Sequence, residues 1–354
     1  MSEVQRTNQL NKANKRGRAA GMPRSEKPRR LRRLNHGRIP YLIDCAISKY
    51  TNPGDSLIVS GFWRSGTTWL QESVAKIVGA KTIFEPFHPL VSTNRTAFSD
   101  HVLRDHDEHF LELHMPYCNE SLPAKNGLHN LFEKSLRATV PGSAVRVLRS
   151  SPLEACRSRV VVKVVRGHLC LRAAQNEFAM PIIHVYRDPR AIVASVRDTD
   201  WAWLFEHLNL EEQLLAVEDG RRRSFETWHD DILSYDRQDI VTKLTAYWAL
   251  TEKYLQNCYS GGSERTAFVP YESLSRNEIT IQSTLGGLNV PYLQDAQLVD
   301  KDSYSTSAVR RGTSIEERNT AWKKKLTTSE VRTIESIVER FGFEDRLVDV
   351  ASLR

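Results

Sequence analysis

The 354-residue sequence has no long apolar run. Its longest apolar segments, Leu57–Trp63 and Val160–Val165, have the length of buried strands and fall far short of the ~20 residues that a membrane-spanning helix needs. The first residues contain no apolar core of the kind that a secretory signal peptide requires. From the sequence we therefore expect neither a transmembrane segment nor a secretory signal.

Cysteine is scarce and scattered. The five cysteines are odd in number and none belongs to a Cys-x-x-Cys pair, so the pattern predicts neither a zinc site nor a disulfide framework. We expect a reducing, cytoplasmic compartment. The five are Cys45, Cys118, Cys156, Cys170 and Cys258.

Acidic residues are nearly absent from one end of the chain. Residues 1–38 carry twelve Lys or Arg against two Glu, a local charge of +10 in a chain whose net charge is +7. Residues 39–354 therefore carry −3. The basic character belongs to a terminal segment and not to the body, which argues against a nucleic-acid-binding groove.

Residues 1–38 also lack aromatic residues and hydrophobic periodicity. We expect a disordered basic tail before a single catalytic domain at 39–354. Two interpretations of the tail stay open. It is either a solvated arm, which we favour, or an attachment to an anionic surface through the basic run at 29–33.

From Ile39 onward, short apolar runs alternate with helical patterns. Near-continuous apolar runs are typical of a parallel sheet that is covered on both faces. The alternation predicts a three-layer α/β fold, with a central parallel sheet flanked by helices. The predicted strands are Leu57–Phe62, Lys81–Phe84, Val160–Val165, Ile182–Tyr186 and Thr266–Val269, and the predicted helices are Thr67–Val78, Arg190–Val196, Ile240–Cys258 and Ser329–Phe341.

Two long stretches interrupt this alternation. Residues 88–158 and 197–239 are polar and rich in His, Trp, Asp and Arg. Insertions of this length in an α/β domain usually form lids or substrate-binding walls, and we expect that role here.

The segment Gly61–Thr68 follows a predicted strand and opens a predicted helix. In that position, backbone N–H groups and the helix N-terminus face an anion. The two glycines and Thr68 align with the loop GxxxxGK[ST] that binds nucleoside triphosphates, but Thr67 stands where that loop has lysine. Because that lysine serves the β- and γ-phosphates, its absence suits a donor without them. Arg64 supplies a cation instead.

The segment Arg64–Leu70 resembles the 5′-phosphosulfate loop of sulfotransferases that use 3′-phosphoadenylyl sulfate (PAPS). The resemblance implies a P-loop-like fold and a PAPS-dependent sulfotransferase. Arg64 is similar to carbohydrate-directed members, whereas cytosolic members that modify phenols and steroids have lysine there. The loop residues that the resemblance places at the donor are Arg64, Ser65, Gly66, Thr67, Thr68 and Trp69.

A second strand–helix unit carries Arg187–Ser195. It resembles the family's 3′-phosphate motif, in which a strand-end arginine and a helical serine bind that phosphate; Arg187 and Ser195 match them. A third fragment, Arg310-Arg311-Gly312 followed by Trp322, resembles the C-terminal segment that closes over the nucleotide. For this third fragment a second interpretation stays open, namely a solvated basic loop without a role at the nucleotide.

The transfer also needs a general base for the acceptor hydroxyl. Glu85 is our first candidate, since it ends the second predicted strand in a Phe-Glu-Pro segment similar to that of carbohydrate-directed members. His88 is the alternative, and a salt-bridged strand end is the competing interpretation of Glu85. We expect PAPS as the donor and 3′,5′-adenosine bisphosphate (PAP) as the product. We expect no metal.

The acceptor is expected to be a hydroxyl, in the first instance of a sugar or glycoconjugate, with a non-carbohydrate alcohol or lipid as the alternative. A nucleotide kinase is the rival from another enzyme class, and it would need the missing loop lysine. No nucleic acid is expected as a partner.

Overall fold

A computed structural model describes residues 37–88, 106–122, 127–294 and 313–348. Its centre is a parallel sheet of five strands in the order β2-β3-β1-β4-β5. Each predicted strand is confirmed, as is the three-layer fold class. The strands are β1 (Leu57–Ser60), β2 (Lys81–Phe84), β3 (Val160–Val164), β4 (Ile182–Tyr186) and β5 (Thr266–Pro270).

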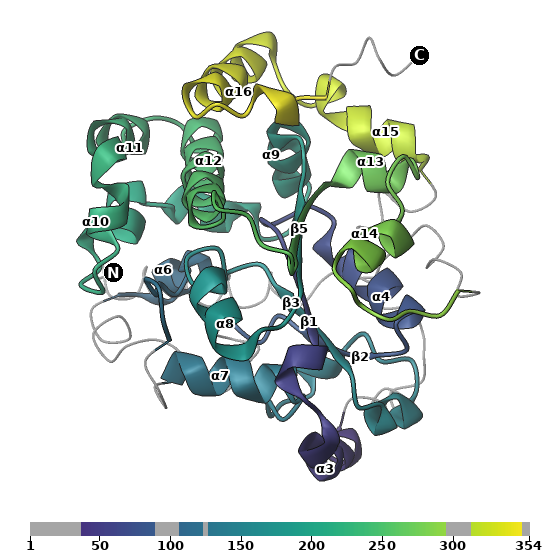
Figure 1. Ribbon diagram of the computed structural model, residues 1–354. Coiled ribbons are helices and arrows are strands. Elements are labelled where there is room, and N and C mark those ends of the chain that lie inside the picture. Colours follow the sequence, from purple (N-terminus) through teal and green to yellow (C-terminus); the bar gives the residue numbers. More distant parts are fainter. Residues whose placement is uncertain (1–36, 89–105, 123–126, 295–312, 349–354) are drawn as a thin grey trace, which may run out of the picture. The chain divides into compact units, whose positions relative to one another are not determined.

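Helices cover both faces of the sheet (Figure 1). On one face α4 (Thr67–Ile77) and α14 (Ile281–Gly287) bury apolar side chains against the strands. On the other face α7 (Gly127–Leu136) and α8 (Leu171–Phe178) do the same. Burial on both faces is the reason that the strands read as near-continuous apolar runs.

A third cluster of buried apolar side chains, the third core, packs beside the sheet. It includes residues of α9 (Pro189–Arg197), α12 (Ile240–Cys258) and α16 (Thr328–Arg340), which Figure 1 shows close together. The ends of all four predicted helices agree with the structure to within one residue. A capping box begins α16, since Thr327 Oγ1 accepts from Glu330 N and the Glu330 side chain accepts from Thr327 N.

The described parts of the two stretches expected to form lids or substrate-binding walls also contribute to the core. Residues 127–136 form α7, whose Leu131 and Phe132 are buried under the sheet. Within 197–239, Phe205 and Phe225 are fully buried among the aromatic side chains of the third core. The sequence did not predict this core contribution, because the apolar residues stand singly among polar ones and only tertiary contacts reveal that they share a face.

The start of the folded domain also differs slightly from expectation. Arg38, assigned to the tail, is the first residue of α3 (Arg38–Ile47), while residues 1–36 lie outside the described part. The helix is held through Asp44, whose carboxylate is fully buried. It pairs with Lys81 at 3.1 Å and with Arg146 and Arg149 at 2.8 Å each.

The remaining elements are short. They are α6 (Glu108–Leu113), α10 (Arg222–Phe225), α11 (His229–Asp236), α13 (Tyr271–Ser275), α15 (Ile315–Thr320), a π-helical turn η7 (Glu212–Ala216), and the 3₁₀ turns η1 (Ser48–Tyr50), η2 (Pro53–Asp55), η4 (Ala144–Arg146), η5 (Pro152–Cys156), η6 (Ala202–His207), η8 (Glu226–Trp228), η10 (Ala321–Lys324) and η11 (Glu344–Arg346).

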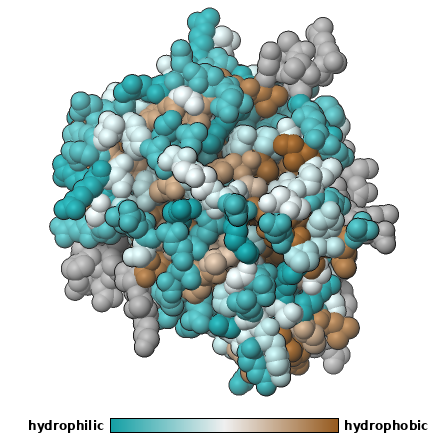
Figure 2. All heavy atoms as spheres, viewed as in Figure 1, coloured by the Kyte–Doolittle hydropathy of each residue, from teal (hydrophilic) through white to brown (hydrophobic). Residues whose placement is uncertain are grey.

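The surface in Figure 2 is mostly hydrophilic, and the hydrophobic residues on that face form separate patches. Within the described ranges, no helix combines the length and the apolar character that crossing a bilayer demands.

Candidate active site

All five strands are parallel, so their carboxyl ends meet at one edge of the sheet. In open α/β sheets ligands bind outside this edge, next to the strand where the order reverses, which here is β1. Each strand delivers polar or charged residues to the edge. After or near the strand ends lie Arg64 (β1), Glu85 (β2), Lys163 and Arg166 (β3), Arg187 (β4), and Tyr271 and Glu272 (β5).

The loop after β1 turns sharply into α4. Gly61 packs so closely against β4 that a Cβ there would lie 2.3 Å from the carbonyl oxygen of Val185. Gly66 forms the N-cap of α4 with φ 86°, and Tyr271 fills the space where its side chain would be. The backbone of Arg64 also adopts the left-handed conformation, with φ 67°. Such strain in a non-glycine residue is typical of functional sites.

The structure joins the two predicted phosphate sites. Arg64 Nε donates to Ser195 Oγ at 2.9 Å, across 131 residues of sequence. Arg187 Nη1 donates to the backbone carbonyl of Arg64 at 3.0 Å. The loop after β1 and the β4–α9 unit therefore form one continuous polar site.

This site has unsatisfied hydrogen-bonding groups. Ser65 Oγ and Arg187 Nε are buried and have no hydrogen-bond partner within the described residues. Buried polar groups are nearly always satisfied, by protein, water or ligand. An anion between the loop and β4 would satisfy both groups, so the residues present fit a phosphorylated donor.

The cation of Arg187 is held in place from three directions. Its guanidinium lies over the ring of Tyr271, 4.6 Å from the centroid. Nη2 donates to the carbonyl of Arg318 in α15 at 3.4 Å, and Nη1 to that of Arg64. The segment after residue 312 therefore packs against this site, whereas Arg310, Arg311 and Gly312 lie outside the described residues.

Arg190 has a structural role, although it belongs to the same Arg-Asp-Pro-Arg sequence. It makes a bidentate pair with Asp188, the N-cap of α9, and a second pair with Glu335 at 2.8 Å. Its guanidinium also stacks 4.2 Å from the ring centroid of Trp322. Trp322 thus fixes the C-terminal segment to the start of α9.

Glu85 sits between two cations. Lys163 Nζ donates to Oε1 at 2.6 Å and Arg166 Nη1 to Oε2 at 3.2 Å. Burial by itself raises the pKa of Glu85, but the two cations outweigh it and lower the pKa to about 2. The backbone of Glu85 is left-handed, with φ 42°. The salt-bridged strand end is therefore present, and it lies at the predicted site.

His88 lies beside this pair, with its backbone N–H donating to the carbonyl of Glu85 at 3.1 Å. Burial and the charge of Arg166 lower the pKa of His88 to about 3. Both candidate bases are therefore unprotonated at neutral pH. The structure places the two candidate bases side by side.

Lys163 connects the candidate base to the loop. Besides Glu85, its Nζ donates to Thr68 Oγ1 at 2.8 Å, and burial lowers its pKa. Lys163 and Arg166 are ion-paired residues at the site that the sequence analysis did not identify as site residues. A lysine within an apolar strand, Val160–Val164, is the signal that could have drawn attention to them.

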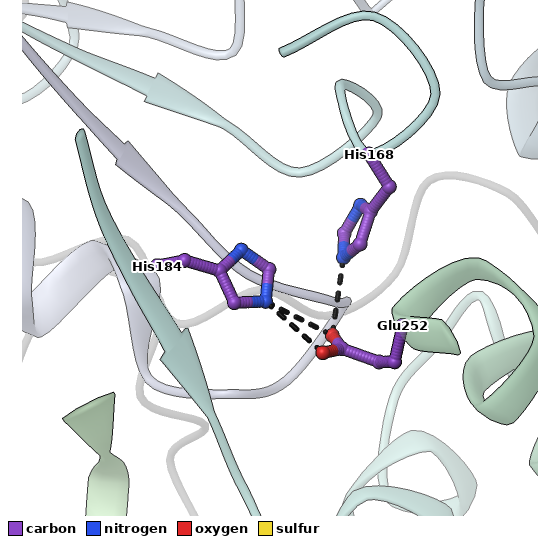
Figure 3. A group of neighbouring side chains, drawn as sticks. All are labelled: His168, His184 and Glu252. Carbon is purple, nitrogen blue, oxygen red and sulfur yellow. Dashed lines mark hydrogen bonds and ion pairs between the residues drawn. The ribbon is translucent and has the colours of Figure 1, made fainter. Parts of the chain in front are cut away.

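A separate cluster in the core is made of His168, His184 and Glu252, all buried (Figure 3). Both imidazoles point their Nε2 atoms at the carboxylate, at 3.1–3.2 Å. Among the described residues, one potential ligand atom from each of these three side chains lies within 4.8 Å of the other two, a spacing that suits a metal ion. Arg346 Nη1, however, already donates to Glu252 at 2.6 Å. A divalent cation beside that guanidinium would leave excess positive charge in a dry interior.

We therefore interpret this cluster as a hydrogen-bonded network. Glu252 of α12 accepts from three donors, which tie the loop after β3, the middle of β4 and η11 together. His184 Nδ1 completes the network with Ser60 Oγ of β1, at 3.3 Å.

The chain matches the family model of the sulfotransferase domain over residues 54–279. Solved structures with a similar fold include the sulfotransferase domain from the curacin biosynthetic pathway (16% identity, 80% of this chain and 97% of that chain, TM-score 0.40). Others are sulfotransferase STF9 from Mycobacterium avium (15%, 85% and 79%, TM-score 0.39) and mouse sulfotransferase SULT7A1 complexed with PAP (13%, 88% and 92%, TM-score 0.36).

The comparison with curated proteins gives no match. The match to the sulfotransferase domain covers well over half of the chain. It includes all five strands and the loops at their carboxyl ends. The chain therefore belongs to the sulfotransferase family, which confirms the enzyme class predicted from the sequence.

Proposed function

We propose that this enzyme transfers the sulfuryl group of PAPS to a hydroxyl of a sugar or glycoconjugate. The observation that supports the donor most strongly is the link between the two anion sites through Arg64, Ser195 and Arg187. One nucleotide with a 5′-phosphosulfate on the loop and a 3′-phosphate at β4–α9 would use both sites and satisfy the buried atoms of Ser65 and Arg187.

In this proposal the loop holds the donor. Backbone N–H groups of residues 65–68 and the N-terminus of α4 face the 5′-phosphate. Arg187 and Ser195 take the 3′-phosphate. The reaction needs positioning and charge stabilisation more than covalent work by the protein, as phosphoryl transfer does.

The acceptor oxygen attacks sulfur in line. The bond from sulfur to the acceptor oxygen forms while the bond from sulfur to the bridging oxygen of the 5′-phosphate breaks, and PAP leaves. Arg64 and Lys163 stabilise the negative charge that grows on the bridging and sulfuryl oxygens. Lys163 suits this role because its Nζ lies between Thr68 of the loop and the candidate base.

The acceptor proton goes to Glu85, with His88 as the alternative. Glu85 is ionised in the free site, so it is ready to accept a proton. Its pKa of about 2 makes it a weak base. Donor sulfuryl oxygens that draw Lys163 away from the carboxylate would raise that pKa and strengthen the base.

A sugar acceptor is supported by the residues that resemble the carbohydrate-directed branch, Arg64 and the Phe-Glu-Pro segment ending in Glu85 and Pro86. A second support is Trp203, which is 40% exposed and lies edge-on to His109 of α6, with ring centroids 5.3 Å apart. Helix α6 reaches the site, since Arg166 Nε donates to the carbonyl of Glu112. Trp203 thus contacts a helix that borders the site, and its exposed indole is suited to stacking on a sugar ring.

The test is in two stages. Thermal shift with PAP, ATP and a short oligonucleotide should show stabilisation by PAP, and stabilisation by ATP alone would overturn the donor assignment. Labelled PAPS should then be offered with a panel of glycosides, lipid-linked sugars and simple alcohols. Transfer to alcohols or lipids with none to sugars would retain the sulfotransferase and replace the acceptor.

A further inference from the structure

A carboxylate that the proposed reaction does not use lies behind Arg187. Glu272 follows β5 directly, in α13, and is only 5% exposed. Strands β4 and β5 pair in register, with Tyr186 opposite Pro270. The next residues along each strand, Arg187 and Tyr271, therefore emerge side by side, and Glu272 follows them into the interior.

Glu272 touches the backbone and the charge of the β4–α9 turn. Its Oε1 accepts from the backbone N–H of Asp188 at 3.2 Å and lies 3.9 Å from Arg187 Nε. That Nε is the buried atom without a hydrogen-bond partner in the described residues. Glu272 therefore lies next to the one guanidinium nitrogen of Arg187 that is buried without a hydrogen bond in the described residues, at a distance too long for a hydrogen bond of its own.

The charges that face Glu272 are few. From β4 and the start of α9 they are Arg187, Asp188 and the phenol of Tyr186. The carboxylate of Asp188 is engaged by Arg190 and by the N–H of Val348, so it does not neutralise Arg187. From α15 the neighbouring groups are uncharged: the carbonyl of Arg318 on Arg187, and the amide of Asn319 on Ser275.

Glu272 is consequently the counter-ion of Arg187 in the free site. Burial raises its pKa, Arg187 lowers it and Asp188 raises it, with the result at about 7. Near neutral pH the carboxylate is therefore close to half ionised, and a small change in its surroundings alters its charge.

We propose that Glu272 is a positioning residue for Arg187 that takes up a proton when a 3′-phosphate binds. This inference rests on the proposed donor site. An incoming phosphate dianion replaces the carboxylate as partner of the guanidinium, and it repels the remaining negative charge. For each 3′-phosphate that binds, one proton moves from solvent to a carboxylate oxygen of Glu272. No bond to phosphorus forms or breaks.

The linkage predicts weaker donor binding in alkaline solution. Above pH 7 the free site has an ionised Glu272, and the proton must be supplied from an increasingly dilute pool. The association constant for PAP should then fall by up to about tenfold per pH unit. A nucleotide without the 3′-phosphate should not show this fall.

Isothermal titration calorimetry at pH 8 measures the proton directly. PAP is titrated into the full-length enzyme in three buffers of different ionisation enthalpy, and 5′-AMP serves as the ligand without a 3′-phosphate. At this pH the ligand phosphates are already ionised. Wild type should take up roughly 0.5–1 proton more with PAP than with 5′-AMP. Glu272→Gln, which keeps an acceptor for the Asp188 N–H, should show no such difference.

The outcomes separate this inference from the function it rests on. If wild type does not bind PAP, the donor assignment fails. If PAP binds and proton uptake is the same in wild type and Glu272→Gln, Glu272 is not linked to the phosphate. If Glu272→Gln does not fold, the comparison of PAP with 5′-AMP on wild type still decides, because equal proton uptake for the two ligands overturns the proposal.

Discussion

Arg64 Nε donates to the hydroxyl of Ser195 at 2.9 Å, although 131 residues separate them in sequence. One residue belongs to the loop after β1 and the other to the second turn of α9. Because the loop cation and the helical hydroxyl are already in contact, the two halves of the proposed donor site are held in register before any ligand binds. Such preorganisation avoids reorganisation at the moment of reaction.

Replacing Arg64 by alanine should remove the loop cation while leaving the fold intact, since Arg64 is only partly buried. We expect kcat to fall by about 10²–10³.

Ser195→Ala should chiefly weaken PAP binding, by roughly fivefold to tenfold for one lost hydrogen bond. Steady-state kinetics and PAP titration measure the two effects. Arg197→Ala, on the same helix and paired with Glu330 at the surface, is the matched control and should change neither.

Glu85→Gln should spare PAP binding and lower kcat by about 10²–10⁴, the usual range for a general base. The control is Glu177→Gln, a surface carboxylate near His129 that lies away from the sheet edge. Full turnover of Glu85→Gln on the true acceptor would transfer the role to His88. In that case His88→Gln should show the loss instead.

The pH profile of kcat follows from the same site. The pKa values of Glu85 and His88 are lowered to about 2 and about 3, so both stay unprotonated between pH 7.5 and pH 5.5. These values belong to the free site, so kcat/KM, which reports the free enzyme, should show no acid limb from either group in this window. In kcat, which reports the complex, an acid limb of Glu85 should lie at higher pH, because the bound donor raises its pKa. An acid limb in kcat/KM with a midpoint near pH 6.5 would mean that a group of ordinary histidine basicity accepts the proton.

Gly61 has no space for a side chain, since a Cβ would lie 2.3 Å from the Val185 carbonyl of β4. Gly61→Ala should displace the start of the loop, weaken PAP binding and destabilise the fold by about 1–3 kcal/mol. Thermal melts and PAP titration test this. Gly261→Ala is the control, because nothing lies within 4 Å of its added Cβ.

The His168–His184–Glu252 network should stabilise the protein without taking part in turnover. Glu252→Gln leaves the buried Arg346 unpaired, and we expect a loss of about 3–5 kcal/mol in the free energy of unfolding. Glu278→Gln, an exposed partner of Arg276, should cost almost nothing. If metal depletion lowers the melting temperature of wild type and zinc restores it, the network is a metal site after all.

Stability should also fall in mild acid. Burial lowers the pKa of His168 and of His114, so both are neutral in the fold and titrate near 6.5 when unfolded. As pH falls below about 6.5, the unfolded chain takes up protons that the folded chain does not. The melting temperature should therefore be lower at pH 5.5 than at pH 7.5, and His168→Gln should reduce the difference between the two.

The alternation of apolar strands and helical patterns was enough to locate all five strands and four principal helices. Strands buried on both faces are apolar along their whole length, and α4 and α9 begin at turns whose glycine or proline is visible in the sequence. The donor loop and its partner motif are short and contiguous, so local sequence carries them. The pairing partners of Glu85 are different, because Lys163 and Arg166 come from another strand.

The sequence by itself therefore determined the parallel α/β architecture, the strand-end loop at Gly61–Thr68 and the enzyme family. Only the tertiary structure decided that the described parts of 88–158 and 197–239 supply core side chains, that Arg64 contacts Ser195, and that Glu85 lies between two cations. The reason is that backbone turns and burial are encoded by neighbours in sequence. Ion pairs and unsatisfied donors arise from strand order, which brings distant strand ends to one edge.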